Sequence, residues 1–251
     1  MDKIVILTGA GISAESGLGT FRGAGGLWEE KRIEDVATPE GFARDPQMVT
    51  DFYNMRRGKH REVQPNAAHE ALARLQRDYP GEVVIITQNV DRLHERGGSA
   101  GVIHMHGVLD GLLCNACGHR WDWPFERKLD LRTPCPRCGL APTRPDVVWF
   151  GEMPYFMDEI DAHLSGCDLF VAIGTSGNVY PAAGFVQYAN AVGADTLEIN
   201  LDASEVSSIF ARKIRGRPAR RFPHGSTRCC PGRVDICPED GPGRGVPAYS
   251  R

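Results

Sequence analysis

The 251-residue chain contains no apolar run that approaches the length of a membrane-spanning helix. Its first eight residues, Met1–Thr8, include an acidic residue and lead quickly into glycines, which is not the composition of a signal peptide or an anchor. We therefore expect a cytoplasmic protein that does not bind a membrane. The length allows a sizeable core and predicts one or two domains.

The body of the chain also lacks the basic excess that is typical of nucleic-acid binding. The formal net charge is −3, but residues 211–251 carry ten Lys or Arg against three Asp or Glu, which leaves residues 1–210 at −10. An acidic body offers no electrostatic footprint for nucleic acid, so we expect no direct binding to it.

Residues 211–251 lack any helical or strand period. They contain six prolines, six glycines and three cysteines. We expect this segment to be an irregular tail.

The start of the chain predicts a dinucleotide site. Lys3–Thr8 is typical of a buried strand, and the following Gly9-Ala-Gly-Ile-Ser-Ala14 fits the Gly-x-Gly-x-x-Gly fingerprint in its alanine variant. Glycines there let the backbone approach a pyrophosphate at a helix N-terminus. A glycine-rich stretch, Gly17–Trp28, then stands where an ordinary unit would begin its second strand, so we expect a functional loop.

A polar cluster is predicted where the next strand ends. Val83–Ile86 is a charge-free β-branched run, typical of a strand buried on both faces, and Gln88, Asn89 and Asp91 follow it. Open α/β sheets bind their ligands at this end of the strands. The alternative is a strand followed by a helix cap, with Asn89 or Asp91 capping.

Two histidines follow a second short strand, Val102-Ile103. His104 and His106 share one face at a period of two, so one imidazole could reach the same crevice; the alternative is that both are merely packed.

The last third of the body repeats the strand-to-polar pattern. Cys167–Ile173 is a buried strand that leads into Gly174-Thr-Ser-Gly-Asn178, a second phosphate-sized turn. A helix over 181–192 precedes a strand over 196–201 that ends near Asn200. Strands that alternate with helices predict an α/β fold with a doubly wound, Rossmann-like parallel sheet.

Four of the eight cysteines form two Cys-x-x-Cys pairs, Cys114/Cys117 and Cys135/Cys138, with 17 residues between the pairs. In a reducing compartment this spacing indicates one tetrahedral zinc ion per chain. A closed four-sulfur site leaves no position for substrate, so the zinc is predicted to be structural. The alternatives are that His119 is a ligand or that the cysteines are unrelated.

Residues 29–80 are predicted to be largely helical. On the helix that contains Met48–Arg57, Tyr53 and Arg56 are three residues apart and share a face. The alternative is a surface arginine beside a half-buried tyrosine.

Several of these motifs, in this order over residues 1–210, resemble those of the sirtuins, the NAD-dependent protein-lysine deacylases. The motifs are Gly9-Ala-Gly-Ile-Ser13, Phe21-Arg22, Thr87-Gln-Asn-Val-Asp91, His106-Gly107, the four cysteines, Phe150-Gly-Glu152, Gly174-Thr-Ser176 and Ile199-Asn200. The resemblance implies a Rossmann-like NAD domain made of residues 1–30, 66–106 and 143–210. It also implies a helical insertion at 31–65, a small zinc-binding module at 107–142 and a family-atypical tail at 211–251.

The resemblance further implies that NAD is the co-substrate and that His106 is the general base on the nicotinamide ribose. The acyl oxygen of an acyl-lysine attacks the ribose carbon, nicotinamide leaves, and His106 then helps a ribose hydroxyl to attack the O-alkylimidate, which leads to O-acyl-ADP-ribose. The residues expected to contact NAD are Gly9, Ala10, Gly11, Ser13, Phe21, Arg22, Gln88, Asn89, Asp91, Gly174, Thr175, Ser176 and Asn200.

Within that set, the resemblance assigns the ribose to Gln88 and Asn89 and the nicotinamide carboxamide to Asp91. Ala10, Phe21 and Arg22 are expected to line and order the loop over NAD. Ser176 and Asn200 are expected to meet phosphate and the adenosine ribose.

Acyl-lysine proteins are the implied partners, and we expect the chain to be a monomer. The substrate peptide is expected to add as a strand between the segments Phe150-Gly151-Glu152 and Gly177-Asn178-Val179, with Val148 and Phe150 beside the lysine stem.

The acyl group is expected to be acidic. Tyr53 and Arg56 match the Tyr-x-x-Arg of the subgroup that removes such groups, and Ala37 leaves room in the pocket. A guanidinium beside a phenol favours a succinyl or malonyl carboxylate over an acetyl methyl group.

Parts of the sequence also fit two other functions. A zinc nucleobase deaminase would use Pro134-Cys-Pro-Arg-Cys138 with His60-Arg-Glu62, but 71 residues separate Glu62 from Pro134. In addition, Cys114 and Cys117 would fill the coordination position that a deaminase must leave open for the reacting water. A non-enzymatic NAD-sensing binder is the second alternative, since the tail departs from the strand and apolar helix with which the family usually ends.

Overall fold

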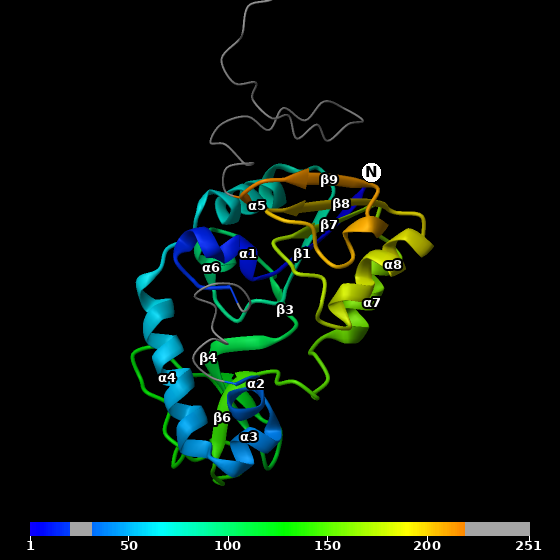
Figure 1. Cartoon of the computed structure of the whole chain (residues 1–251). Helices are drawn as coiled ribbons and strands as arrows, with labels where there is room; N and C mark the ends of the chain where they lie inside the picture. The colour runs from blue at the N-terminus through cyan, green and yellow to red at the C-terminus, as the bar shows by residue number, and fades with distance from the viewer. Residues whose placement is uncertain (21–31, 219–251) are drawn as a thin grey trace, which may run out of the picture.

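A computed structural model describes residues 1–20 and 32–218, so the predicted contacts of Phe21 and Arg22 lie outside the described residues. A six-stranded parallel sheet has the strand order β3-β2-β1-β7-β8-β9 (Figure 1). This is the doubly wound order and confirms the predicted fold class. The strands, in spatial order, are β3 (Ile103–His104), β2 (Glu82–Thr87), β1 (Lys3–Thr8), β7 (Leu169–Ile173), β8 (Asp195–Asn200) and β9 (Arg212–Arg215).

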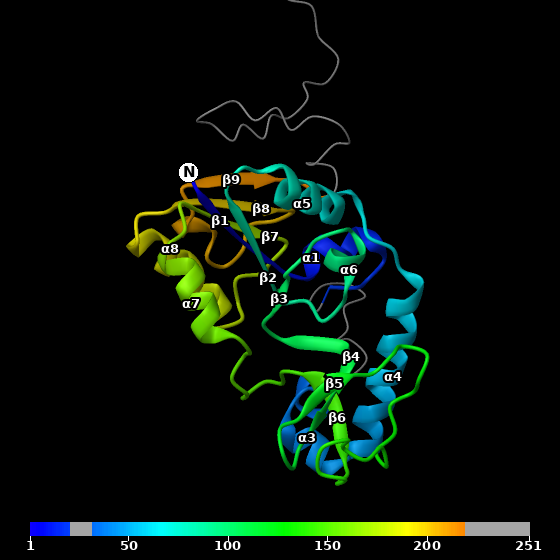
Figure 2. The ribbon, with the colours of Figure 1, turned by 180° about the vertical axis from the view of Figure 1, so that it is seen from behind.

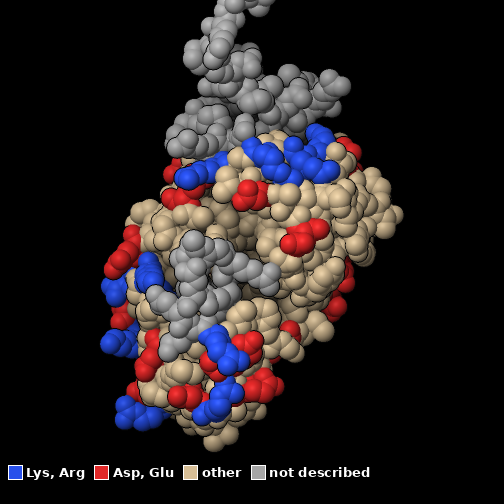
Figure 3. All heavy atoms as spheres, in the orientation of Figure 1, with Lys and Arg blue, Asp and Glu red and all other residues tan. Residues whose placement is uncertain are grey.

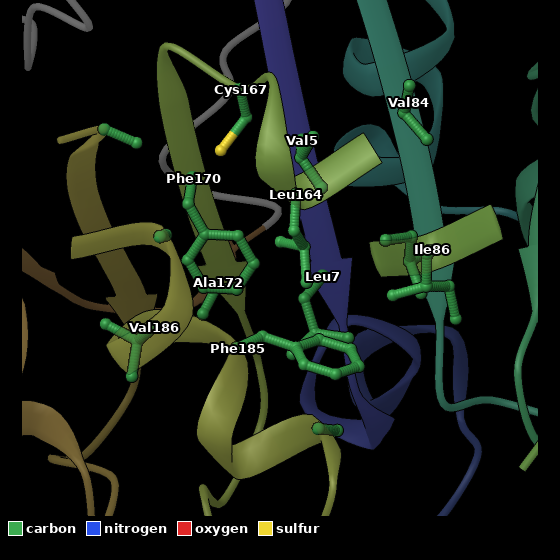
Figure 4. Packing of buried hydrophobic residues seen from close by; sticks show 14 of the residues in the cluster. Val5, Leu7, Val84, Ile86, Leu164, Cys167, Phe170, Ala172, Phe185 and Val186 are labelled. Carbon is green, nitrogen blue, oxygen red and sulfur yellow. The ribbon is translucent and has the colours of Figure 1, made fainter. Parts of the chain in front are cut away.

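Helices cover both faces of this sheet, which is why its central strands β1, β2 and β7 are mostly apolar (Figures 1 and 2). Helix α5 (Ala67–Asp78) packs Leu72 against Ile4 and Ile6 on one face. On the other face, α7 (Met157–Ser165) and α8 (Phe185–Ala191) pack against a cluster that includes Val5 and Phe170 (Figure 4). The remaining short helices of this domain are α1 (Ala10–Ser13), α6 (Leu93–Arg96), η1 (Ala14–Ser16), η2 (Ala182–Gly184) and η3 (Ser207–Ile209).

The helical insertion and the zinc module form one small domain, although about 45 residues of the large domain separate them in the sequence (Figure 1). Both contribute to a single apolar cluster that includes Val36, Phe52, Leu109 and Leu112. Its elements are α2 (Ile33–Val36), α3 (Pro39–Arg44), α4 (Pro46–Glu62) and the antiparallel strands β5 (Arg120–Asp122), β4 (Gly107–Cys114) and β6 (Thr143–Val147), in that spatial order.

Two predicted boundaries are wrong. Strand β6 pairs with β4, so residues 143–147 belong to the small sheet and not to the NAD domain. Residues 212–215 are not irregular, because β9 extends the large sheet beside β8. The sequence of β9 does not alternate apolar and polar residues, so its pattern did not predict a strand. A strand at the edge of a sheet can form without that alternation. No helix among the described residues has the length and apolar character needed to span a membrane.

Candidate active site

The turns after β1 and β7 interlock at the point where the strand order reverses. The Gly9 amide donates to the Ile173 carbonyl (3.0 Å) and the Gly11 amide to the Gly174 carbonyl (2.8 Å). Gly174 has φ +63°, and a Cβ atom there would lie 2.4 Å from the Ile12 nitrogen. Glycine is therefore required for this approach, and the crevice it leaves is where doubly wound sheets bind ligands.

A cavity of about 770 Å³ opens at this edge of the sheet and extends to the small domain. Most residues that were predicted to bind NAD or substrate line it. They are Gly9, Ala10, Gly11, Ala37, Tyr53, Arg56, Gln88, Asn89, His106, Val148, Phe150, Gly151, Gly174, Thr175, Ser176, Val179 and Asn200.

A second cavity of about 290 Å³ adjoins the first, since Ala10, Arg56 and Asn89 line both. Ser13 and Asp91 line this smaller cavity. The remaining predicted residue, Gly177, lines neither of the two cavities; its φ of +69° instead serves the turn that follows β7.

Polar side chains at the strand ends are bonded to one another. Gln88 donates through Nε2 to the Thr175 hydroxyl (3.0 Å), and Asn200 donates through Nδ2 to the Thr175 carbonyl (2.7 Å). Asn89 donates through Nδ2 to the Gly9 carbonyl (3.2 Å). The ends of β1, β2, β7 and β8 are thus tied together across the crevice.

Asp91 is buried at the bottom of this group. It accepts hydrogen bonds from the Ser13 hydroxyl (3.1 Å) and the Leu93 amide (3.0 Å). Burial raises the pKa of Asp91, and those two hydrogen bonds oppose the rise. The bond to Leu93 satisfies the first amide of α6, so Asp91 both orders the turn before this helix and lines a cavity.

His106 is the histidine that lines the main cavity. Its Nδ1 lies 3.1 Å from the Gln88 carbonyl oxygen. A carbonyl can only accept, so Nδ1 carries the hydrogen and Nε2 of the neutral ring has the lone pair. Burial lowers the pKa of His106, although the bond to Gln88 opposes this, and the neutral ring is the form that can accept a proton.

Tyr53 and Arg56 are both buried in the cavity wall, with exposed fractions of 1% and 4%. The reading of Arg56 as a surface residue is therefore wrong. The guanidinium carbon lies 5.7 Å from the centroid of the Tyr53 ring. Burial lowers the pKa of Arg56 and raises that of Tyr53, and the neighbouring charge of Arg56 opposes the rise at Tyr53.

A buried group behind Tyr53 was missed from the sequence. Trp149 donates through Nε1 to the Tyr53 hydroxyl oxygen (2.8 Å). Its ring lies 4.0 Å from the Arg144 guanidinium, which pairs with Glu152 at 2.5 Å. Glu152 also accepts from the Trp149 amide (2.8 Å). A tryptophan within an extended apolar run is indistinguishable from core packing, so only the three-dimensional contact reveals it.

The four cysteine sulfurs lie within 4.8 Å of one another. The Cys114–Cys138 and Cys117–Cys135 sulfur distances are 3.6 and 3.7 Å. A zinc ion at about 2.3 Å from four thiolates requires sulfur separations of about 3.8 Å, so the cysteines are positioned to bind one zinc ion.

His119 stacks on Trp121 and does not belong to this sulfur cluster. A four-sulfur site has no open position for a reacting water, which rules out the deaminase alternative. None of the four cysteines is among the described residues that line the main cavity. The cluster therefore holds the loops of the small domain together and takes no part in chemistry at the cavity.

Comparisons with known proteins agree with this architecture. A sequence model of the Sir2 family matches residues 9–181. An NAD-dependent protein deacylase from Escherichia coli is 54% identical over 224 residues, which cover 88% of this chain and 81% of that protein. A Sir2 homologue solved with ADP-ribose has a TM-score of 0.81 at 40% identity and covers 88% of each chain. A Sir2 homologue solved with NAD has a TM-score of 0.79 at 40% identity, over 88% of this chain and 86% of that one.

Proposed function

This chain belongs to the Sir2 family and is an NAD-dependent protein deacylase, and we propose that it prefers succinyl or malonyl groups on lysine to acetyl groups. The observation that carries the proposal is the burial of Tyr53 and Arg56 together in the wall of the cavity that His106 lines. The products are nicotinamide, O-acyl-ADP-ribose and the free lysine of a protein substrate.

Arg56 supplies the charge that an acidic acyl group needs. Moving a carboxylate out of water is costly unless a charged donor meets it, and a guanidinium offers two parallel hydrogen bonds. An acetyl group ends in a methyl and gains nothing from that charge. Arg56 therefore separates the two classes of acyl group.

Tyr53 supplies a second donor, because of the direction of its bond to Trp149. The indole N–H can only donate, so the Tyr53 oxygen accepts and keeps its own hydrogen for another partner. Among the described residues that hydrogen meets no acceptor. A carboxylate in the cavity thus accepts from Tyr53 and Arg56 together, and Ala37 leaves space for it.

His106 acts as the general base of the reaction. The Gln88 carbonyl holds Nδ1–H, so Nε2 accepts the proton of a ribose hydroxyl. NAD supplies the electrophilic ribose carbon. Gln88 and Asn89 hold the ribose, and Asp91 accepts from the nicotinamide amide.

The second glycine turn and the end of β8 hold the far end of the dinucleotide. Ser176 meets phosphate, and Asn200 meets the adenosine ribose. Both residues line the main cavity together with the glycines of the interlocked turns.

The substrate peptide enters as an added strand at the cavity mouth. Phe150, Gly151, Val179 and Val148 all line the main cavity, which supports a role for them in contacting the peptide and the lysine stem. Phe150 is 47% exposed, which suits a side chain that is covered when the peptide binds.

The test uses succinyl-lysine and acetyl-lysine versions of one peptide, with and without NAD, followed by mass spectrometry. We expect NAD-dependent loss of both groups, with the larger kcat/KM for succinyl. Arg56→Met should lower succinyl kcat/KM about 10- to 100-fold, because a charge-assisted hydrogen bond contributes about 1.5–3 kcal/mol, and should leave acetyl activity within about threefold.

Arg61→Met, an exposed change on the same helix, is the matched control and should alter neither activity. An equal fall in both activities with Arg56→Met, or no fall in either, rules out the carboxylate clamp. Turnover of neither peptide by the wild-type chain would instead support an NAD-binding protein without deacylase activity.

A further inference from the structure

Arg144 and Glu152 form an ion pair that holds both ends of the segment that carries Trp149. Arg144 donates through Nη2 to Glu152 Oε1 (2.5 Å) and through Nη1 to the Val147 carbonyl (3.3 Å). The other carboxylate oxygen of Glu152, Oε2, accepts from the Trp149 amide (2.8 Å). Both oxygens of the carboxylate and both terminal nitrogens of the guanidinium thus hold residues 147–152 in one conformation.

The indole ring of Trp149 is enclosed as well. The residue is 3% exposed. Its ring centroid lies 4.0 Å from the Arg144 guanidinium carbon and 5.3 Å from the centroid of the Phe42 ring. With the ring and its backbone held, the indole N–H is directed at the Tyr53 hydroxyl oxygen (2.8 Å).

This hydrogen bond decides in which direction the Tyr53 hydroxyl can donate. An indole N–H donates and cannot accept, so the bond uses the Tyr53 oxygen as an acceptor and leaves its hydrogen for a carboxylate in the cavity. A donor that is already oriented loses less entropy when its ligand binds. An acetyl group ends in a methyl and does not use that donor. The orientation of Trp149 should therefore change succinyl and acetyl turnover by different factors.

We propose that Trp149, held by the Arg144–Glu152 pair, is a positioning residue that sets acyl selectivity through the Tyr53 hydroxyl. The inference rests on the acidic acyl preference proposed above. Among the described residues, Arg144 does not line the main cavity, so it has no direct contact with a ligand held there. The alternative is that Trp149 and the ion pair only pack the small domain.

The first test is a double-mutant cycle on the ratio of succinyl to acetyl kcat/KM, measured with two versions of one peptide. Trp149→Phe keeps an aromatic ring beside Arg144 but removes the N–H donor. The ratio should fall about three- to tenfold, the range expected for one hydrogen bond. In the Tyr53→Phe background the same change should leave the ratio within about twofold, because no hydroxyl remains to be oriented. An unchanged ratio in Trp149→Phe, or an equal fall in both backgrounds, overturns the proposal.

The ion pair is tested by Glu152→Gln, which keeps the shape of the side chain and removes its charge. The ratio should fall about three- to fivefold, but should stay within about twofold in the Tyr53→Phe background. Any loss of peptide contacts at Glu152 cancels in the ratio, because the two substrates share one peptide sequence. Glu159→Gln, at an exposed glutamate of α7, is the matched control and should keep the wild-type ratio. A ratio in Glu152→Gln that equals the ratio in the control overturns the role given to the ion pair.

Proton–nitrogen NMR of the indole groups follows Trp149 without any substrate. The chain has four tryptophans, and the Trp149 signal is the one that is lost in Trp149→Phe. Its N–H should exchange slowly with solvent in the wild type and about threefold faster, or more, in Glu152→Gln. Equal exchange in the two proteins overturns the proposal. A wild type without succinyl preference overturns the proposed function and this inference with it, whereas a preference that persists undiminished in Trp149→Phe overturns this inference alone.

Discussion

The two ends of the main cavity are built in different ways. At the cofactor end, Asn89, Gln88 and Asn200 are bonded to the opposing turns within the protein. At the acyl end, the wall depends on stacking and burial, with Tyr53 set by Trp149. In the proposed function, the first arrangement holds NAD, the ligand that every reaction shares. The second presents the Tyr53 hydroxyl and Arg56 to the acyl group, the part of the substrate that varies.

Loss of the zinc ion is expected to have the largest effect on stability and activity, because the small domain carries the acyl end. Cys135→Ser should abolish zinc binding, lower the melting temperature and remove activity toward both acyl groups, since structural zinc sites contribute directly to folding. Metal analysis and thermal unfolding measure this. A variant that keeps its zinc and its melting temperature contradicts the four-cysteine site. Cys167→Ser, at a buried cysteine outside the cluster, is the control and should keep the metal.

The next largest effect is expected at His106, where the two ends meet. His106→Ala should lower kcat about 10²–10⁴-fold for succinyl and acetyl substrates alike, because a general base is lost. NAD affinity, measured by calorimetry, should change little. Burial lowers the pKa of His106, so wild-type activity should fall only when acid protonates the ring, as the pH drops through that lowered value. An inactive His104→Ala beside an active His106→Ala would reverse the assignment of the base.

Local spacing in the sequence points to the cofactor end, whereas most residues of the acyl end were named through the family resemblance, and the reason is physical. Glycine turns and polar strand ends are contiguous in the chain, so spacing alone indicates their chemistry. The acyl end draws Ala37, Tyr53 and Trp149 from three separated segments, and no local pattern relates them. The hydrogen bond from Trp149 to Tyr53, which fixes the Tyr53 oxygen as an acceptor, forms only in the folded chain.

Removal of the Tyr53 hydroxyl tests whether the acyl end recognises a carboxylate. Tyr53→Phe removes the proposed donor and keeps the ring against Phe52 and Trp149. Succinyl kcat/KM should fall about tenfold, near the lower bound for a hydrogen bond to a charged group, while acetyl kcat/KM stays within about threefold. KM for NAD is the internal control, because the change lies away from the cofactor end. Equal losses for both acyl groups would mean that the hydroxyl only supports packing.

The smallest expected effect concerns β9, a strand that was not predicted because its sequence is basic. Figure 3 shows Lys and Arg side chains gathered at this end of the molecule. Arg215 reaches the fully buried Glu198 on β8, which also accepts from the Ser204 amide (3.2 Å) and the Ser207 hydroxyl (2.5 Å). That loop includes Asp202 and Ser204, which line the main cavity. Arg215 therefore acts on the cofactor end through Glu198.

Arg215→Met should accordingly raise KM for NAD about two- to fivefold, the size of effect expected for a partly exposed ion pair, with kcat and acyl preference unchanged. Lys213→Met, on the same strand but exposed, should have no effect. If the two variants behave alike, β9 contributes charge to the surface and nothing to the cofactor loop. If Arg215→Met also changes the ratio of succinyl to acetyl activity, the two ends of the cavity are coupled, and the division between a rigid cofactor end and an independent specificity end does not hold.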